Sequence, residues 1–235
     1  MTTILEDLLP RQERTTMAEN IYEDIKQLLL SGAIPPGEKL TLRGLADIFG
    51  ASPMPVRDAV ARLVIEGALE MLPNRSVRVF KPSLAEFREI VTLRCCLEGL
   101  ATACATERLD DETLARIAEC VERYEQAGHQ EKINTEFVIA SNRELHFTLY
   151  RVCEMPRLVS MIENIWTQIA PLFALSMSIQ ERGTEHWESF GHHRRLLEAL
   201  MRRDPEAARQ AVVDDIRDAA IYIESVQVFK EHRER

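Results

Sequence analysis

The sequence predicts a mainly α-helical protein of two domains, a winged helix-turn-helix followed by an all-helical bundle of six helices. The chain has 235 residues, which is enough for two domains of ordinary size, and 46% of them are hydrophobic. Apolar residues recur at helical spacing along most of the chain. Only residues 69–80 have the pattern of two short strands joined by a tight turn.

The first domain is expected at residues 17–81, after a flexible arm at residues 1–16. Ser52 is a natural N-cap, and the prolines that follow it suit only the first turn of a helix. Three helices and a hairpin are expected, at residues 17–31, 41–49, 53–67 and 69–80. This order of elements is that of a winged helix.

The second domain is expected at residues 84–228, after the linker at 81–83. No strand pattern occurs there, and several helix starts have capping residues, Ser83, Asp110 and Asp204. Six helices are expected, at residues 84–108, 110–128, 132–154, 156–177, 184–202 and 204–230. They predict a helical bundle.

Charge and cysteine content restrict the class of protein. The net charge of −9 disfavours DNA binding, but residues 11–82 alone have a net charge of +1. The acidic excess therefore lies in the second half, where it repels DNA. No apolar run is long enough for a membrane span, and the five cysteines have no Cys-x-x-Cys spacing. A reduced cytoplasmic protein is expected.

DNA contacts are expected from the helix that begins near Ser52 and from the hairpin. The first turn of a recognition helix faces the major groove, and basic residues at a hairpin tip reach a minor groove or the backbone. The candidate residues are Arg43, Ser52, Met54, Pro55, Arg57, Arg75 and Arg78. The alternative is that the arginines are ordinary solvated surface residues, which their convergence on one face disfavours.

Several segments of this domain resemble the winged helix of the GntR family of transcription regulators. They are LTLRGLA (40–46), ASPMPVRDA (51–59), RL (62–63) and EGAL (66–69). The resemblance covers residues 18–80 and implies binding to double-stranded DNA. Pro53 stands where the family usually has arginine, and Ser76 where the wing usually has glycine. The operator is therefore expected to differ from the family's common one.

Four polar residues lie on otherwise apolar helix faces in the second domain. Asn142 and His146 are four apart and share a face, whereas His193 and Asp215 lie on the two last helices. Together they offer nitrogen and oxygen ligands that suit a divalent ion such as zinc, nickel or manganese. On spacing alone, ordinary core polar residues are the stronger interpretation.

Residues 84–226 resemble the helical effector domain of the FadR subfamily, called FCD, in the branch with six helices (VanR-like). NRELH (142–146) resembles its aspartate-x3-histidine motif, and HHRRLLEAL (192–200) with DPEAA (204–208) resembles its histidine segment. The resemblance implies a metal ion held by Asn142, His146, His193 and Asp215. Two positions depart, because Asn142 replaces an aspartate and Asp215 a histidine. The nearest competitors are His186, His192 and Asp214.

Arg94 lies on the buried stripe of the first bundle helix, where a guanidinium needs a partner. One interpretation is an ion pair with Glu98 or another acid of the bundle. The other, which the resemblance implies, is that Arg94 binds the carboxylate of a small organic acid held by the metal. The branch with six helices favours such an acid over a long acyl chain.

These observations predict an effector-responsive transcription regulator, a repressor of a metabolic operon. We expect a homodimer on a palindromic operator, because one recognition helix reads only a few base pairs. The alternatives are a metal-sensing regulator and a metalloenzyme fused to a DNA-binding domain. No nucleophile elbow, phosphate loop or His-Glu-x-x-His helix supports the enzyme.

Overall fold

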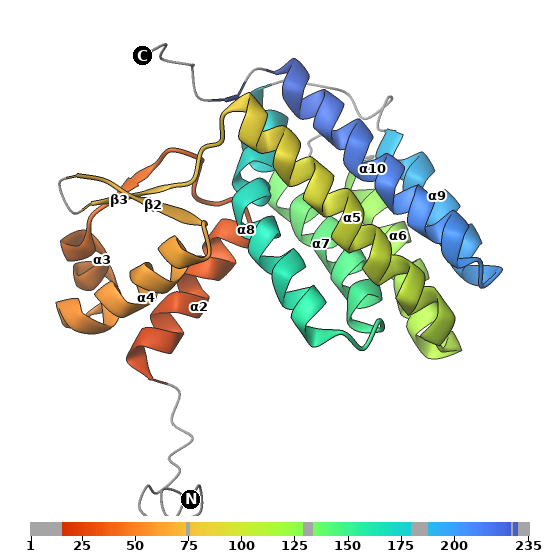
Figure 1. Ribbon diagram of the computed structural model, residues 1–235, viewed down its shortest axis with the longest axis horizontal. Helices are drawn as coiled ribbons and strands as arrows, with labels where there is room; N and C mark the ends of the chain where they lie inside the picture. The colour runs from red at the N-terminus through yellow and green to blue at the C-terminus, as the bar shows by residue number, and fades with distance from the viewer. Residues whose placement is uncertain (1–15, 74–75, 129–133, 180–187, 227, 230–235) are drawn as a thin grey trace, which may run out of the picture.

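The computed structural model describes residues 16–73, 76–128, 134–179, 188–226 and 228–229. These residues form helices α2 to α10 and a three-stranded sheet, arranged as a small domain beside a larger helical bundle (Figure 1). The expected fold class is confirmed. Of the expected N-terminal arm, only Thr16 is described, and its side chain caps the first helix by accepting from the backbone N–H of Glu19.

The small domain is built on three helices around one apolar core. They are α2 (Met17–Leu30), α3 (Leu42–Phe49) and α4 (Pro53–Ile65). Helix α2 contributes Ile21, Tyr22 and Ile25 to this core, each 1% exposed. Gly50 ends α3 with a φ of 58°, a left-handed conformation that glycine adopts without strain, and so permits the tight turn into α4.

The sheet of this domain has one strand more than the sequence predicts. Its strands are β1 (Lys39–Leu40), β2 (Leu69–Met71) and β3 (Val77–Val79), in the order β1-β3-β2 and all antiparallel. The hairpin of β2 and β3 is the expected wing. Strand β1 pairs Leu40 with Val77, and its two residues are too few for any alternation to reveal them.

The larger domain contains six helices within its described residues, as expected. They are α5 (Leu84–Arg108), α6 (Asp111–Gly128), α7 (Thr135–Arg151), α8 (Pro156–Ile179), α9 (Glu188–Met201) and α10 (Pro205–Ser225). Some ends differ from the prediction. Helix α7 stops at Arg151 rather than at 154, where Glu154 has a φ of 57°, and α10 stops at Ser225 rather than at 230.

All three expected helix caps are present in the bundle. Ser83 and Glu86 form a capping box at the start of α5, in which each side chain binds the other's backbone N–H. Asp110 accepts from the backbone N–H of Thr113 at the start of α6, and Asp204 from that of Ala207 at the start of α10. These caps satisfy N–H groups that have no partner within the helix.

Helix α8 lies between the small domain and the rest of the bundle (Figure 1). Gly32 follows α2 with a φ of 71°, and a Cβ there would lie 2.4 Å from the Cβ of Ala174. Lys26 forms an ion pair with Glu163 at 2.6 Å, and the Gln168 side chain donates to a backbone carbonyl of the small domain. The two domains are therefore joined by close packing and by polar contacts.

Helix α8 is also long and apolar enough to meet the length and composition test for a membrane span. The window Pro156–Ser178 has a mean hydropathy of 1.3, and 44% of it is buried. Its inward side chains, among them Ile162, Trp166 and Leu172, belong to the bundle cores. We therefore interpret α8 as a core helix of the bundle.

Candidate functional site

The first turn of α4 presents an exposed surface that can contact DNA. Ser52 occupies the N-cap position, but its hydroxyl makes no capping hydrogen bond and so remains available for a phosphate. Met54 is 65% exposed, Pro55 is half-buried, and Arg57 is exposed on the same turn. Arg43 of α3 is exposed as well.

The arginines of the small domain differ in their partners. Among the described residues, its arginine ion pairs involve Arg62, which binds Glu66 at 3.1 Å, and Arg78, which binds Glu70 at 2.5 Å. Arg43 and Arg57 form no ion pair with the acidic residues that the structure describes. The structure thus leaves the two helix arginines free for phosphate or base contacts, whereas Arg78 is already held on the wing. Arg75, at the hairpin tip, lies outside the described residues.

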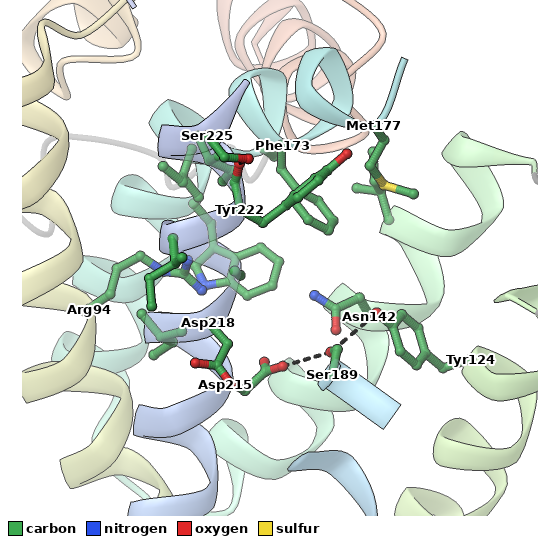
Figure 2. Close-up of a pocket in the computed structure, with 18 residues that line it drawn as sticks. Arg94, Tyr124, Asn142, Phe173, Met177, Ser189, Asp215, Asp218, Tyr222 and Ser225 are labelled. Atoms are coloured by element: carbon green, nitrogen blue, oxygen red, sulfur yellow. Dashed lines mark hydrogen bonds between the residues drawn. The ribbon is translucent and has the colours of Figure 1, made fainter. Parts of the chain in front are cut away.

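A cavity of about 390 Å³ lies inside the helical bundle (Figure 2). Most of its wall is apolar or aromatic, and its charged groups come from two helices, α5 and α10. The polar and charged residues that line it are Arg94, Tyr124, Asn142, Ser189, Asp215, Asp218, Tyr222 and Ser225. A cavity with a largely apolar wall and a few convergent polar groups is typical of a small-molecule site.

Three of the four expected metal ligands meet beside this cavity. His146 of α7, His193 of α9 and Asp215 of α10 each offer a ligand atom, and these atoms all lie within 4.8 Å of one another. The Nε2 atoms of His146 and His193 lie 3.4 and 3.6 Å from Asp215 Oδ2. All three residues are buried. One divalent ion can therefore replace these long contacts with three ligand bonds.

The hydrogen bonds of His146 and the burial of His193 suit metal binding. The Tyr150 hydroxyl donates to Glu98 at 2.7 Å and lies 3.0 Å from His146 Nδ1. Because its single proton is given to Glu98, it must accept from Nδ1–H, so Nε2, which faces Asp215, is the nitrogen that can bind a metal. Burial lowers the pKa of His193, and the Asp215 charge offsets this only in part, which favours the neutral ring that a metal requires.

Buried atoms without hydrogen-bond partners also favour a ligand here. Both ring nitrogens of His193 and Oδ1 of Asn142 are buried and, within the described residues, have no partner. Asn142 lines the same cavity, and Figure 2 shows its amide next to Ser189. Ser189 donates to Asp215 at 2.6 Å, which orients that carboxylate. Unsatisfied buried groups are costly, so this donor set fits a metal ion.

Arg94 forms the ion pair of its first interpretation, whereas its contact with an effector stays a prediction. It forms an ion pair with Glu98 at 2.6 Å, and it also lines the cavity. Burial is the largest influence on the pKa of Arg94 and lowers it, but the charge and hydrogen bond of Glu98, with the nearby Tyr150 and Asp215, together outweigh burial and raise that pKa. Its guanidinium also lies over the Trp166 ring at 5.1 Å. Glu98 therefore already neutralises the only guanidinium in the described cavity wall.

The competing candidates lie apart from the cluster or outside the described residues. His192 pairs with Asp218 at 2.5 Å rather than with Asp215. Asp214 accepts from Gln210 and is not part of the cavity wall. His186 falls outside the described residues.

Comparison with known proteins decides the family. Residues 17–79 match the gntR family of bacterial regulatory proteins, and residues 89–218 match the FCD domain. The chain is 33% identical to the HTH-type transcriptional regulator McbR of Escherichia coli over 205 residues, 87% of this chain and 91% of that protein. It belongs to the GntR family. The family and these relatives are transcription regulators, so this GntR protein is a DNA-binding regulator rather than an enzyme.

Further relatives agree with this assignment. YdhC of Bacillus subtilis, an HTH-type transcriptional regulator, is 26% identical over 82% of this chain and 84% of its own length. The solved structure of E. coli McbR/YncC has a TM-score of 0.81 at 29% identity, covering 90% of this chain and 99% of that one. FCD domains often bind metal, which agrees with the histidine and aspartate cluster in this GntR protein.

Sequence reasoning missed several residues of the site in this GntR protein. Tyr150 holds His146, Ser189 holds Asp215, and Asp218 lines the cavity, while Glu98, expected only as a partner of Arg94, also holds Tyr150. Two of them had a signal in the sequence. Tyr150 follows His146 by four residues and so shares its helix face, and Asp218 follows Asp215 by three.

Proposed function

We propose that this regulator represses a metabolic operon and releases its operator when a small organic acid binds to the metal-containing helical domain. The observation that supports this most is the cluster of His146, His193 and Asp215 beside a cavity of about 390 Å³. Three protein ligands leave coordination positions open, and oxygens of an acid can fill them. Asn142 supplies a fourth, weaker oxygen ligand.

The ion would be zinc, nickel or manganese, held by Asn142, His146, His193 and Asp215. When bound, it would supply a positive charge that attracts an anionic ligand into a wall that otherwise contains two carboxylates. Arg94 would contribute to binding the acid from α5 while it remains paired with Glu98.

We also propose that the protein acts in the cytoplasm as a homodimer on a palindromic operator. One recognition helix reads too few base pairs for specific binding, so two copies of α4 are needed. The contacts would come from Arg43, Ser52, Met54, Pro55 and Arg57, with Arg75 and Arg78 on the wing. Two-fold symmetry of the dimer would then match that of the operator.

Effector binding can reach the DNA-binding domain through α8. Its side chains Trp166 and Ile169 line the cavity, whereas Glu163, Gln168 and Ala174 of the same helix contact the small domain. A shift of α8 that accommodates a ligand would therefore move the small domain as well.

The second candidate function is a regulator for which the ion itself is the signal, favoured by the unpartnered atoms of His193. Gel shifts on a DNA fragment from upstream of the protein's own gene separate the two. Under our proposal, metal-loaded protein binds the fragment and candidate acids release it. Release by metal alone would support the second function, and no binding with or without metal would contradict both.

A further inference from the structure

The charge of the cavity wall restricts what the regulator can bind. Three charged side chains line it within the described residues, Arg94, Asp215 and Asp218. Arg94 is neutralised by Glu98, and Asp215 faces the two histidines. Asp218 is therefore the remaining charged group of the described wall, and its partners decide which ligand charge it favours.

Within the described residues no arginine or lysine forms an ion pair with Asp218, whose side chain is 43% exposed. Its Oδ2 lies 2.5 Å from Nε2 of His192. Arg195 lies 2.5 Å from the other nitrogen, Nδ1, and because arginine can only donate, Nδ1 is an acceptor. With Nδ1 as the acceptor, Nε2–H of His192 donates to Asp218 and orients its carboxylate. Figure 2 shows Asp218 close to Asp215 on α10.

The remaining wall offers a ligand one hydrogen-bond donor and an apolar surface. Trp166 lines the cavity, and its buried indole N–H has no hydrogen-bond partner within the described residues, so an acceptor oxygen would be favourable there. Many of the remaining lining side chains are aliphatic or aromatic, Ile139, Ile169, Ala170, Phe173, Met177 and Ile223. The wall thus offers a carboxylate, a spare donor and an apolar surface.

We propose that the effector is a zwitterion of the amino-acid class, with its ammonium group against Asp218 and an apolar side chain against the aliphatic and aromatic wall. This inference rests on the proposed function and specifies its organic acid. In this arrangement the carboxylate of the effector would bind the metal and Arg94. A di- or tricarboxylate would instead place a further negative charge next to Asp218, and the repulsion between the two charges would disfavour its binding.

The test compares pairs of compounds that differ only in the amino group. L-phenylalanine is compared with 3-phenylpropanoate, and L-leucine with 4-methylpentanoate, with the other apolar amino acids treated likewise. Binding to zinc-loaded protein, freed of excess zinc, is measured by titration calorimetry, with citrate as a polycarboxylate probe. We expect at least one amino acid to bind about tenfold or more tightly than its partner, as for a hydrogen bond between charged groups.

Variants of two aspartates on α10 test the assigned contact. Asp218→Asn should remove most of the difference between the members of a pair, while Asp214→Asn, outside the cavity wall, should keep it. Equal or tighter binding of the deaminated compounds, no binding by any pair, or an unchanged difference in Asp218→Asn would each overturn the inference. If citrate binds and releases the operator while amino acids do not, the proposed function survives and this inference fails. Protein that takes up no zinc and releases operator with no compound would contradict the proposed function itself.

Discussion

The hydroxyl of Tyr150 gives a prediction that links the stability of the bundle to its metal affinity. Tyr150 is completely buried, and its hydroxyl bridges Glu98 at 2.7 Å and His146 Nδ1 at 3.0 Å. Burial, followed by the charge of Glu98, raises the pKa of Tyr150 well above its usual range, so the hydroxyl stays protonated and donates. Tyr150→Phe removes this bridge and little volume.

The size of the effect follows from what each partner loses. Glu98 keeps its ion pair with Arg94, but the Nδ1–H of His146 is left buried without an acceptor. Such a loss costs about 1–3 kcal/mol of unfolding free energy, or a few degrees in melting temperature for a chain of this size. Loss of a group that orients a metal ligand lowers metal affinity about 10–100-fold.

The assay is chemical denaturation of metal-free protein beside a zinc titration with a competing chelator. Tyr22→Phe is the matched control, because its hydroxyl is also buried and donates to a carboxylate, Glu66, at 2.8 Å in the other domain. It should lose comparable stability and keep its zinc affinity. Unchanged zinc affinity in Tyr150→Phe, or an equal loss in both variants, would refute the proposed role of the bridge.

Four further outcomes are expected. Arg57→Ala should lose about 1–3 kcal/mol of operator binding per half-site in gel shifts, with its fold intact by circular dichroism; wild-type binding would mean that α4 is not the recognition helix. Arg75→Ala should weaken binding to all sequences and flatten its salt dependence. Asn142→Asp should tighten zinc binding, because a carboxylate is a stronger ligand than an amide; looser or equal binding would exclude position 142 from the site. Lys26→Met should lower unfolding free energy by about 1–3 kcal/mol, and adding Glu163→Gln should cost little more, since the two form one ion pair; additive losses would show that the pair does not couple the domains.

The fold was largely predictable from the sequence, because periodicity and caps are local signals. Ser83 and Asp204 mark helix starts without any knowledge of the tertiary structure, and the gap between Ile65 and Leu69 marks the change from helix to hairpin. Strand β1 was missed because two residues are too few to show a strand pattern, and their extended conformation depends on pairing with β3. Helix ends, such as that of α10 at Ser225, were the least certain for the same reason.

The candidate site was predictable only in part. The helix faces of His146, His193 and Asp215 follow from spacing, but their convergence depends on how α7, α9 and α10 are rotated against one another. That rotation is set by packing across the whole bundle and has no local signal. The contacts of Asp218 with His192 and of Ser189 with Asp215 depend on the same packing, so sequence reasoning could not assign them.

The central claim, a sensor domain built on a metal ion, is tested most directly by metal analysis of protein purified without a histidine tag. The parent and His193→Ala are incubated with zinc, nickel or manganese, freed of excess ion and analysed by mass spectrometry, and their operator binding is measured in parallel. We predict about one ion per chain in the parent and none in His193→Ala, with both proteins binding the operator. A parent that stays metal-free with all three ions and still releases its operator in response to an effector would contradict the metal site, leaving a metal-independent pocket anchored by Arg94.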